Sequence, residues 1–217
     1  MDPAVHSIVS ETKRRRIFQR GQTLQLMTTP NQLRVIVPDD GIRFNAVLDH
    51  LTGVGDFLLT GYRQAAEILL GRFLADPNGT AGERDSLVLP ILFLFRHFLE
   101  LRFKDIIVYG QMLTGQNARW PLGHNLESLW AEVQKVHNAV YGFGVSAQLT
   151  KVGECVADLR QLDPNSESFR YPHDRHGRPV FQHLVIGLKS LSITVASVGD
   201  CLDGISMDMS VRVQALP

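Results

Sequence analysis

The chain lacks several features that would assign it directly to a broad functional class. Its 22 basic and 22 acidic residues cancel. No overall field therefore draws it to nucleic acid or to an anionic membrane, and any such binding must come from local patches. The two cysteines, Cys155 and Cys201, show no C-x-x-C motif and no histidine at ligand spacing. This pattern indicates reduced thiols in a cytosolic protein and predicts no metal site.

Familiar catalytic and targeting motifs are also missing. We find no glycine-rich phosphate loop, no H-E-x-x-H, no G-x-S-x-G and no kinase signature, so we expect no cofactor. The longest apolar run, Leu87 to Phe95, is too short to cross a bilayer and is followed at once by Arg96. The basic run 13–16 follows a weakly apolar segment, the reverse of a secretory signal. We therefore expect a cytoplasmic protein without a membrane anchor.

The most informative stretch is Ser86 to Tyr109, which predicts a central helix. Asp85 and Ser86 are suitable N-cap residues, and Pro90 then falls in the first turn. At about 100° per residue, four polar side chains share one narrow arc while apolar side chains fill the rest. The polar stripe consists of Arg96, His97, Glu100 and Lys104. A helix that is apolar on most sides must be surrounded by other helices.

Helical periodicity elsewhere predicts those neighbours, and hence an all-α helical bundle over residues 41–203. We expect helices over 42–75 (with a bend near Gly53 to Gly55), 126–140, 145–162 and 180–202. Residues 1–40 form an irregular basic leader with a β-type run at 33–37. Residues 204–217 form a tail whose alternating pattern could pair with that run as a small strand.

The polar stripe of the central helix has two interpretations. Arg96 and Lys104 each lie four residues from Glu100, so either cation can pair with the carboxylate along the helix. The stripe is then a charge-balanced network, or the one solvent-facing strip of the helix. Alternatively it binds a phosphate or a carboxylate of a partner.

A second polar cluster lies in the loop 163–179 and at the start of the last predicted helix. It contains the side chains Arg170, His173, Arg175, His176, Arg178 and His183. Arginine binds phosphate bidentately, and histidine exchanges protons near neutral pH. A metal-independent ribonuclease requires these abilities, although a polar surface loop rich in Arg and His explains the composition equally well.

Two further features concern helix ends and faces. His124, in the sequence Gly123-His124-Asn125, lies at a helix start, where it could bind an anion or cap its own helix. The last predicted helix carries a small, weakly polar face suited to close approach of another helix or a second subunit. This face consists of Gly187, Ser190, Thr194 and Ser197.

Three segments together resemble the HEPN superfamily of nucleotide-binding helical domains, over roughly residues 85–203. They read R-H-F-L-E-L-R-F-K-D-I-I, G-H-N-L-E-S-L-W and D-P-N-S-E-S-F-R-Y-P-H-D-R-H-G. The resemblance implies an up-and-down helical bundle that is commonly dimeric. It also implies an RNase with an R-x4-6-H active site, as in toxin–antitoxin and other prokaryotic defence systems.

The resemblance leads to two main hypotheses. In the first, the protein handles RNA as a metal-independent endoribonuclease with Arg178 and His183 as catalytic residues, and Arg170, His173, Arg175 and His176 bind flanking phosphates. Arg170 to His176 and Arg119 to His124 match the same loose spacing. In the second, the bundle is a non-catalytic module that dimerises or binds a partner protein from the same operon. Pro179, where the family usually has a polar residue, favours the second hypothesis. A small-molecule enzyme using His97 and Glu100 is a third.

Overall fold

The computed structural model describes residues 54–76, 80–142, 147–174, 176–181 and 183–216. Our predictions for the leader, including its basic run and its β-type run at 33–37, lie outside these residues, as does the helix predicted over 42–53. The described part contains the helices α2 (Val54–Ala75), α3 (Ala81–Leu113), α4 (Leu126–Tyr141), α5 (Ala147–Leu162) and α6 (Leu188–Gln214), and no strand. The predicted all-α bundle is confirmed.

Helix α3 is longer than predicted at both ends. It begins after Thr80, whose side chain accepts a hydrogen bond from the backbone N–H of Glu83 at 3.3 Å. Thr80 and Glu83 have the spacing of a capping box, a stronger start signal than Asp85-Ser86. Pro90 therefore lies inside the helix, not in its first turn. It costs one backbone hydrogen bond, which the burial of the apolar residues that follow it offsets.

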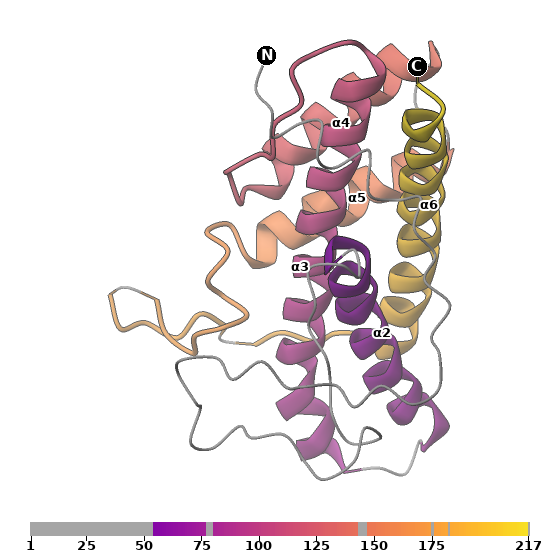
Figure 1. Cartoon of the computed structure of the whole chain (residues 1–217). Helices are drawn as coiled ribbons and strands as arrows, with labels where there is room; N and C mark the ends of the chain where they lie inside the picture. Colours follow the sequence, from indigo (N-terminus) through magenta and orange to yellow (C-terminus); the bar gives the residue numbers. More distant parts are fainter. Residues whose placement is uncertain (1–53, 77–79, 143–146, 175, 182, 217) are drawn as a thin grey trace, which may run out of the picture. The chain divides into compact units, whose positions relative to one another are not determined.

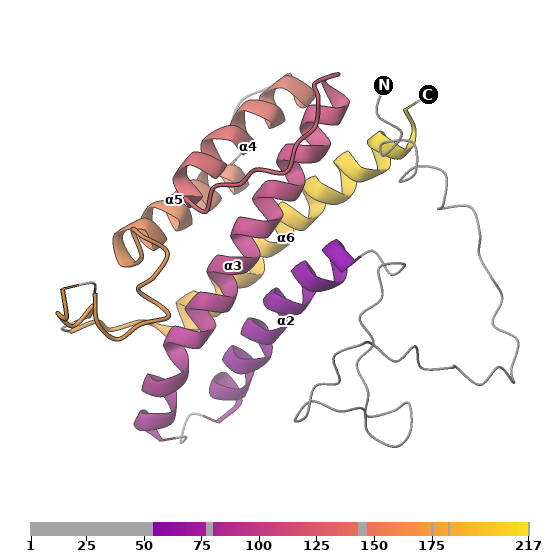
Figure 2. The ribbon, with the colours of Figure 1, turned by 60° about the vertical axis from the view of Figure 1, so that its left-hand side comes forward.

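Helix α3 is also central, as predicted. It contacts α2, α4 and α6, while α5 contacts α4 and α6. Figures 1 and 2 show α2 beside the first half of α3, and the α4–α5 hairpin beside its second half. The side chains of α3 that are almost completely buried are Ile91, Phe95, Phe98, Leu99, Phe103, Ile106 and Ile107.

One connection breaks the simple up-and-down order, because α4 runs parallel to α3. The ring of Phe103 contacts that of Trp130, and further along both helices Gly110 approaches Val136. The loop 114–125 runs back along α3 before α4 begins (Figure 2). This return matters for the site, since Glu100 lies about 20 Å before the end of α3 by the helix rise of 1.5 Å per residue. A short turn would have placed the start of α4 far from Glu100.

Helix α6 differs from its prediction at both ends. It begins at Leu188, not near Val180, so residues 183–187 connect the preceding loop to the helix in a non-helical path. It continues to Gln214, so residues 204–214 are neither a separate tail nor a strand. The physical reason is packing: Ser206 and Met209 are buried in the bundle, which a free tail would not allow.

Candidate functional site

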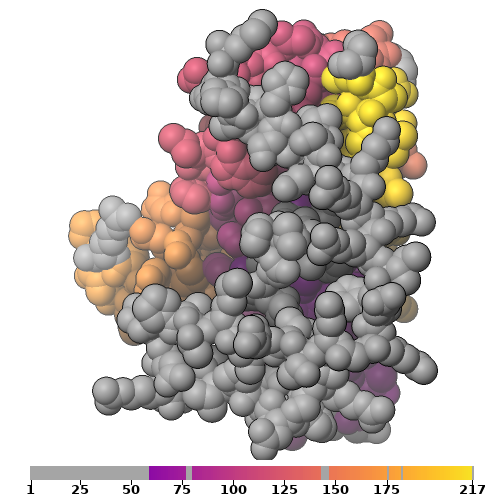
Figure 3. Space-filling view, viewed as in Figure 1, coloured from indigo at the N-terminus to yellow at the C-terminus, as the bar shows by residue number. Residues whose placement is uncertain are grey.

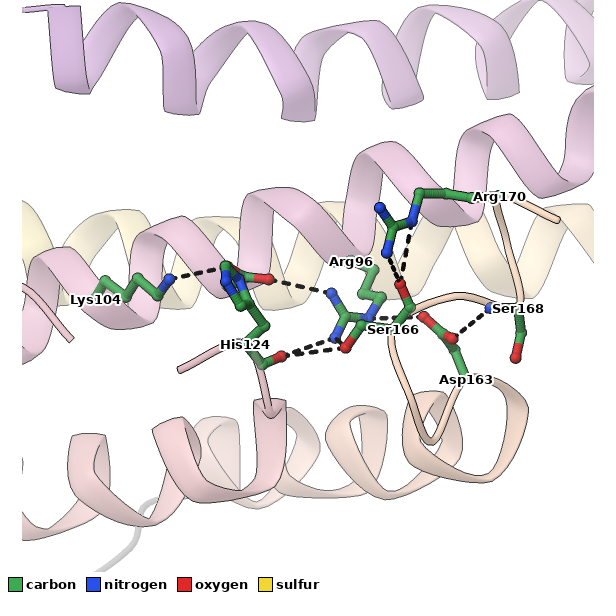
Figure 4. A network of polar contacts seen from close by, with 8 residues as sticks. Arg96, Lys104, His124, Asp163, Ser166, Ser168 and Arg170 are labelled. Atoms are coloured by element: carbon green, nitrogen blue, oxygen red, sulfur yellow. Dashed lines mark hydrogen bonds and ion pairs between the residues drawn. The ribbon is translucent and has the colours of Figure 1, made fainter. Parts of the chain in front are cut away.

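The polar stripe of α3 forms a buried charge network. The carboxylate of Glu100 accepts hydrogen bonds from Arg96 Nη1 at 3.2 Å and from Lys104 Nζ at 3.0 Å. All three residues are buried, because α4 and the loops around it cover this side of α3. Of the alternatives for the stripe, the structure supports a charge-balanced network and rules out a solvent-facing strip. We call Arg96, Glu100, Lys104, His124, Asp163 and Ser166 the Glu100 cluster (Figure 4).

His124 enters the cluster from the return loop. Its Nδ1 lies 2.6 Å from Glu100 Oε1, and its backbone carbonyl accepts a hydrogen bond from Arg96 Nη2 at 2.9 Å. The imidazole itself is 70% exposed. The N-cap of α4 is Asn125, whose side chain accepts from Ser128 N–H, so His124 does not cap its own helix. The structure thus pairs an exposed imidazole with a buried carboxylate.

The protonation of this pair follows from its surroundings. Burial raises the pKa of the Glu100 carboxyl, but hydrogen bonds from Lys104 and His124 outweigh that effect and hold the pKa below its ordinary value. An ionised Glu100 makes Nδ1 of His124 the donor, which leaves Nε2 for solvent or a ligand. Among the described residues, none forms a hydrogen bond or ion pair with Nε2 of His124.

A third segment, directly after α5, closes the cluster. Arg96 Nε lies 2.9 Å from Asp163 Oδ2, and Asp163 Oδ1 accepts from the backbone N–H of Ser168 at 2.7 Å. Ser166 has a positive φ of 63°, unusual for a residue with a side chain. Its hydroxyl contacts the Arg96 guanidinium, and its carbonyl accepts from Arg170 Nε at 3.1 Å. Arg170 is therefore held at the edge of the cluster (Figure 4).

The three segments that carry the HEPN resemblance therefore meet at one place. Two buried cations, Arg96 and Lys104, face two buried carboxylates, Glu100 and Asp163. The exposed Arg170 adds positive charge at the rim, next to the exposed imidazole of His124. The sequence did not predict roles for Asp163 and Ser166, although the D-P-N-S segment contains both. Their contact with α3 could be recognised only from the fold.

Three other residues of this second polar cluster, His173, His176 and Arg178, lie elsewhere, on a small hairpin. His173 forms an isolated bridge with Pro179, and the Asp174 side chain accepts bonds from the backbone N–H groups of His176 and Arg178. Arg178 also pairs with Asp174 at 2.7 Å, and these contacts lower the pKa of Asp174 to about 2, the backbone bond from Arg178 contributing most. This loop (orange) projects away from the helices in Figure 1, and its orange atoms gather on the left of the space-filling view in Figure 3. The positive charge of Arg178 is therefore already balanced by the carboxylate of Asp174.

Arg178 and His183 do not stand at a helix start, contrary to the prediction. Both are exposed residues before α6, and Arg175 lies outside the described residues. His183 lines a largely apolar groove of about 530 Å³ with Leu184, Val185 and the first turns of α3. Arg178 is not among the residues that line this groove. The structure therefore gives the pair no shared site, and their catalytic role stays a prediction.

His97 belongs to a different environment from its neighbours in the stripe. Its ring packs edge-on against Tyr62 of α2, with centroids 4.5 Å apart, and stacks on Phe93 at 5.9 Å. Burial lowers its pKa, which favours the neutral ring. His97 therefore packs between helices, and the enzyme hypothesis that paired it with Glu100 has no geometric support.

These observations define a class: an all-α bundle with a buried ionic cluster that presents one exposed imidazole. None of its described helices is long and apolar enough to cross a membrane. Comparison of the chain with protein-family models, curated proteins and solved structures finds no match, so the HEPN resemblance stays a prediction.

Proposed function

We propose that the protein handles RNA and cleaves it with His124 as the proton-transferring group. One observation carries the proposal: an exposed imidazole whose Nδ1 lies 2.6 Å from a buried carboxylate, Glu100. Such a carboxylate orients the ring, selects its tautomer and stabilises the imidazolium that forms when Nε2 takes a proton. Arg119-x4-His124 also matches the spacing of the resembled family. This assignment replaces His183 as the first candidate.

The chemistry is attack of a ribose 2′-hydroxyl on the adjacent phosphorus. Nε2 of His124 removes the hydroxyl proton, an O–P bond forms, and the bond from phosphorus to the 5′-oxygen breaks. The products are a 2′,3′-cyclic phosphate and a 5′-hydroxyl. The leaving oxygen takes its proton from a second acid, which in a homodimer is His124 of the other copy. In this proposal Arg170, whose Nε donates to the Ser166 carbonyl, stabilises charge on the phosphate.

The test compares two histidine variants for cleavage of single-stranded RNA in EDTA. We expect His124→Ala to lower the rate about 100-fold or more, the usual contribution of general acid–base catalysis. The imidazole is exposed, so the fold should persist, and a circular dichroism spectrum checks this. Lys135→Ala, an exposed change on α4, the helix that follows His124, is the control and should keep full activity.

His183→Ala decides between the two assignments. If this variant loses cleavage while His124→Ala retains it, the catalytic histidine is the one predicted from the R-x4-6-H motif before α6, and the proposal for His124 is wrong. If both variants lose cleavage, both histidines are required. The pH profile of the residual activity of each variant then shows which histidine transfers the proton.

A second candidate function is a non-catalytic interaction module. It is favoured by apolar side chains exposed beside the groove before α6, of which Val185 is 81% and Leu184 39% exposed. Ser190 and Ser197 of the small-residue face are also exposed. Wild-type protein that neither binds nor cleaves RNA would favour this function. A cytoplasmic location, a homodimer, an operon partner and a role in defence or toxin–antitoxin systems stay predictions.

A further inference from the structure

The loop 114–125 presents side chains to solvent that the cleavage mechanism does not use. Trp120 is 49% and Leu122 89% exposed. Arg119 is exposed as well, and its guanidinium has no partner among the described residues. The other tryptophan, Trp130, is buried with its ring centroid 5.5 Å from that of Phe103. The two indoles of the chain therefore have opposite environments.

The loop is held in place although it contains no regular structure. Gln111, in the last turns of α3, accepts the backbone N–H of Gln116 through its carbonyl and that of Arg119 through its side chain, both at 2.9 Å. At the other end, His124 and the Asn125 cap fix the loop to α3 and α4. Trp120 is thus exposed on a segment that is anchored at both ends.

Trp120 also lies close to the candidate proton-transferring group. It precedes His124 by four positions in the chain, which limits the distance between their Cα atoms to about 14 Å. An exposed aromatic ring beside cations is the arrangement that binds single-stranded nucleic acid, because each base stacks on the ring while cations neutralise the phosphates. Arg119, the exposed residue directly before Trp120, supplies positive charge next to the ring.

We propose that Trp120 is a stacking platform for one base of single-stranded RNA, and that Arg119 contacts the adjoining phosphate. The inference rests on the proposed function, since it places a base beside the phosphate that His124 would act upon. It goes further by naming the substrate class as unpaired RNA. A duplex is excluded as the preferred ligand, because its bases are not free to stack on a side chain.

The experiment measures tryptophan fluorescence while a short single-stranded oligonucleotide with 2′-O-methyl riboses is added. This probe cannot be cleaved, because it lacks the attacking hydroxyl. We expect the probe to quench the fluorescence of the wild-type protein. Measured with a labelled probe, Trp120→Ala should bind at least about tenfold more weakly than the wild type. Trp120→Phe should restore most of the affinity. A duplex of the same sequence should bind less tightly than the single strand.

Unchanged binding by Trp120→Ala, or no binding by the wild type, overturns the stacking site. Unchanged RNA binding together with an altered sedimentation coefficient would place the indole in a protein contact, which also overturns it. Binding that depends on Trp120 in a wild-type protein that cleaves no RNA would instead defeat the cleavage proposal and leave this inference standing.

Discussion

Glu100 is the residue on which the candidate site depends. Its carboxylate is buried, and it is kept ionised by Lys104 and His124, which hold its pKa below the ordinary value of 4.5. A carboxyl whose pKa is lower in the folded than in the unfolded state stabilises the fold above the unfolded pKa. This contribution is lost as the pH falls below about 4.5 through the folded pKa.

Glu100→Gln tests this account. At pH 7 we expect the free energy of unfolding to fall by about 3 kcal/mol or more, because Arg96 and Lys104 lose a buried anion. The variant should also show a shallower loss of stability below pH 4.5 than the wild type. Urea denaturation at several pH values measures both effects. Asp208→Asn, which removes an exposed carboxylate with a lowered pKa, should be much milder at pH 7; equal losses would contradict the argument.

Sequence predicted one part of this cluster and missed another for a physical reason. Spacing of four residues places Arg96, Glu100 and Lys104 on one face of a helix, so their pairing could be expected. The contacts of His124 and Asp163 depend on the path of two loops, which no periodicity encodes. His97 follows Arg96 directly in sequence, but one residue turns the helix by about 100°, and the His97 side chain faces α2. Which helix lies in that direction is decided by the fold and could not be predicted from the spacing.

At the scale of elements, the second half of α3 shows why helix ends were predicted poorly. The central helix was expected over Ser86 to Tyr109, but α3 continues through Gly110 to Leu113. A Cβ atom at position 110 would lie 2.6 Å from Val136 Cβ on α4. Glycine is required here for close approach of two helices, and not for a turn. The sequence alone does not distinguish these two uses of glycine.

A pair of glycine substitutions tests the close approach. Gly110→Ala should lower stability by about 1 to 3 kcal/mol, because the new methyl group meets a Cβ that cannot move without shifting α4. Gly61→Ala is the matched control in α2, where a Cβ would have nothing within 4 Å. It should raise stability by about 0.5 to 1 kcal/mol through helix propensity. Thermal unfolding of both variants checks the signs, and a stabilising Gly110→Ala would refute the packing.

The segment before α6 was mispredicted for a related reason. Apolar residues at Phe181, Leu184 and Leu188 fit helical spacing, yet the helix begins only at Leu188. Phe181 instead stacks on Phe169, with centroids 6.3 Å apart, and Ile186 packs against the core. A short apolar run satisfies burial equally well in a non-helical path, so its pattern does not determine its conformation.

At the scale of the described bundle, a second polar network ties three helices together. Arg63 of α2 pairs with Asp200 at 2.5 Å and with Asp203 at 2.6 Å on α6. Arg102 of α3 also pairs with Asp203, at 2.8 Å. Arg63 passes so close to α6 that a Cβ at position 199 would lie 2.5 Å from its guanidinium carbon, and Gly199 leaves that space. The middle of α6 is therefore held to α2 and α3 by ion pairs.

A truncation distinguishes this arrangement from the separate tail expected over 204–217. Ending the chain after Asp203 removes Met209, which is completely buried, and Ser206, whose hydroxyl lies 2.5 Å from Asp105 Oδ2. Loss of the Met209 side chain alone should cost about 2 to 5 kcal/mol, so the shortened protein should be severely destabilised. Ending it after Gln214 removes only residues beyond α6 and should change stability by about 0.5 kcal/mol or less. Urea denaturation compares the two proteins with the full chain. Similar stability after both truncations would mean that the last turns of α6 contribute nothing to the core.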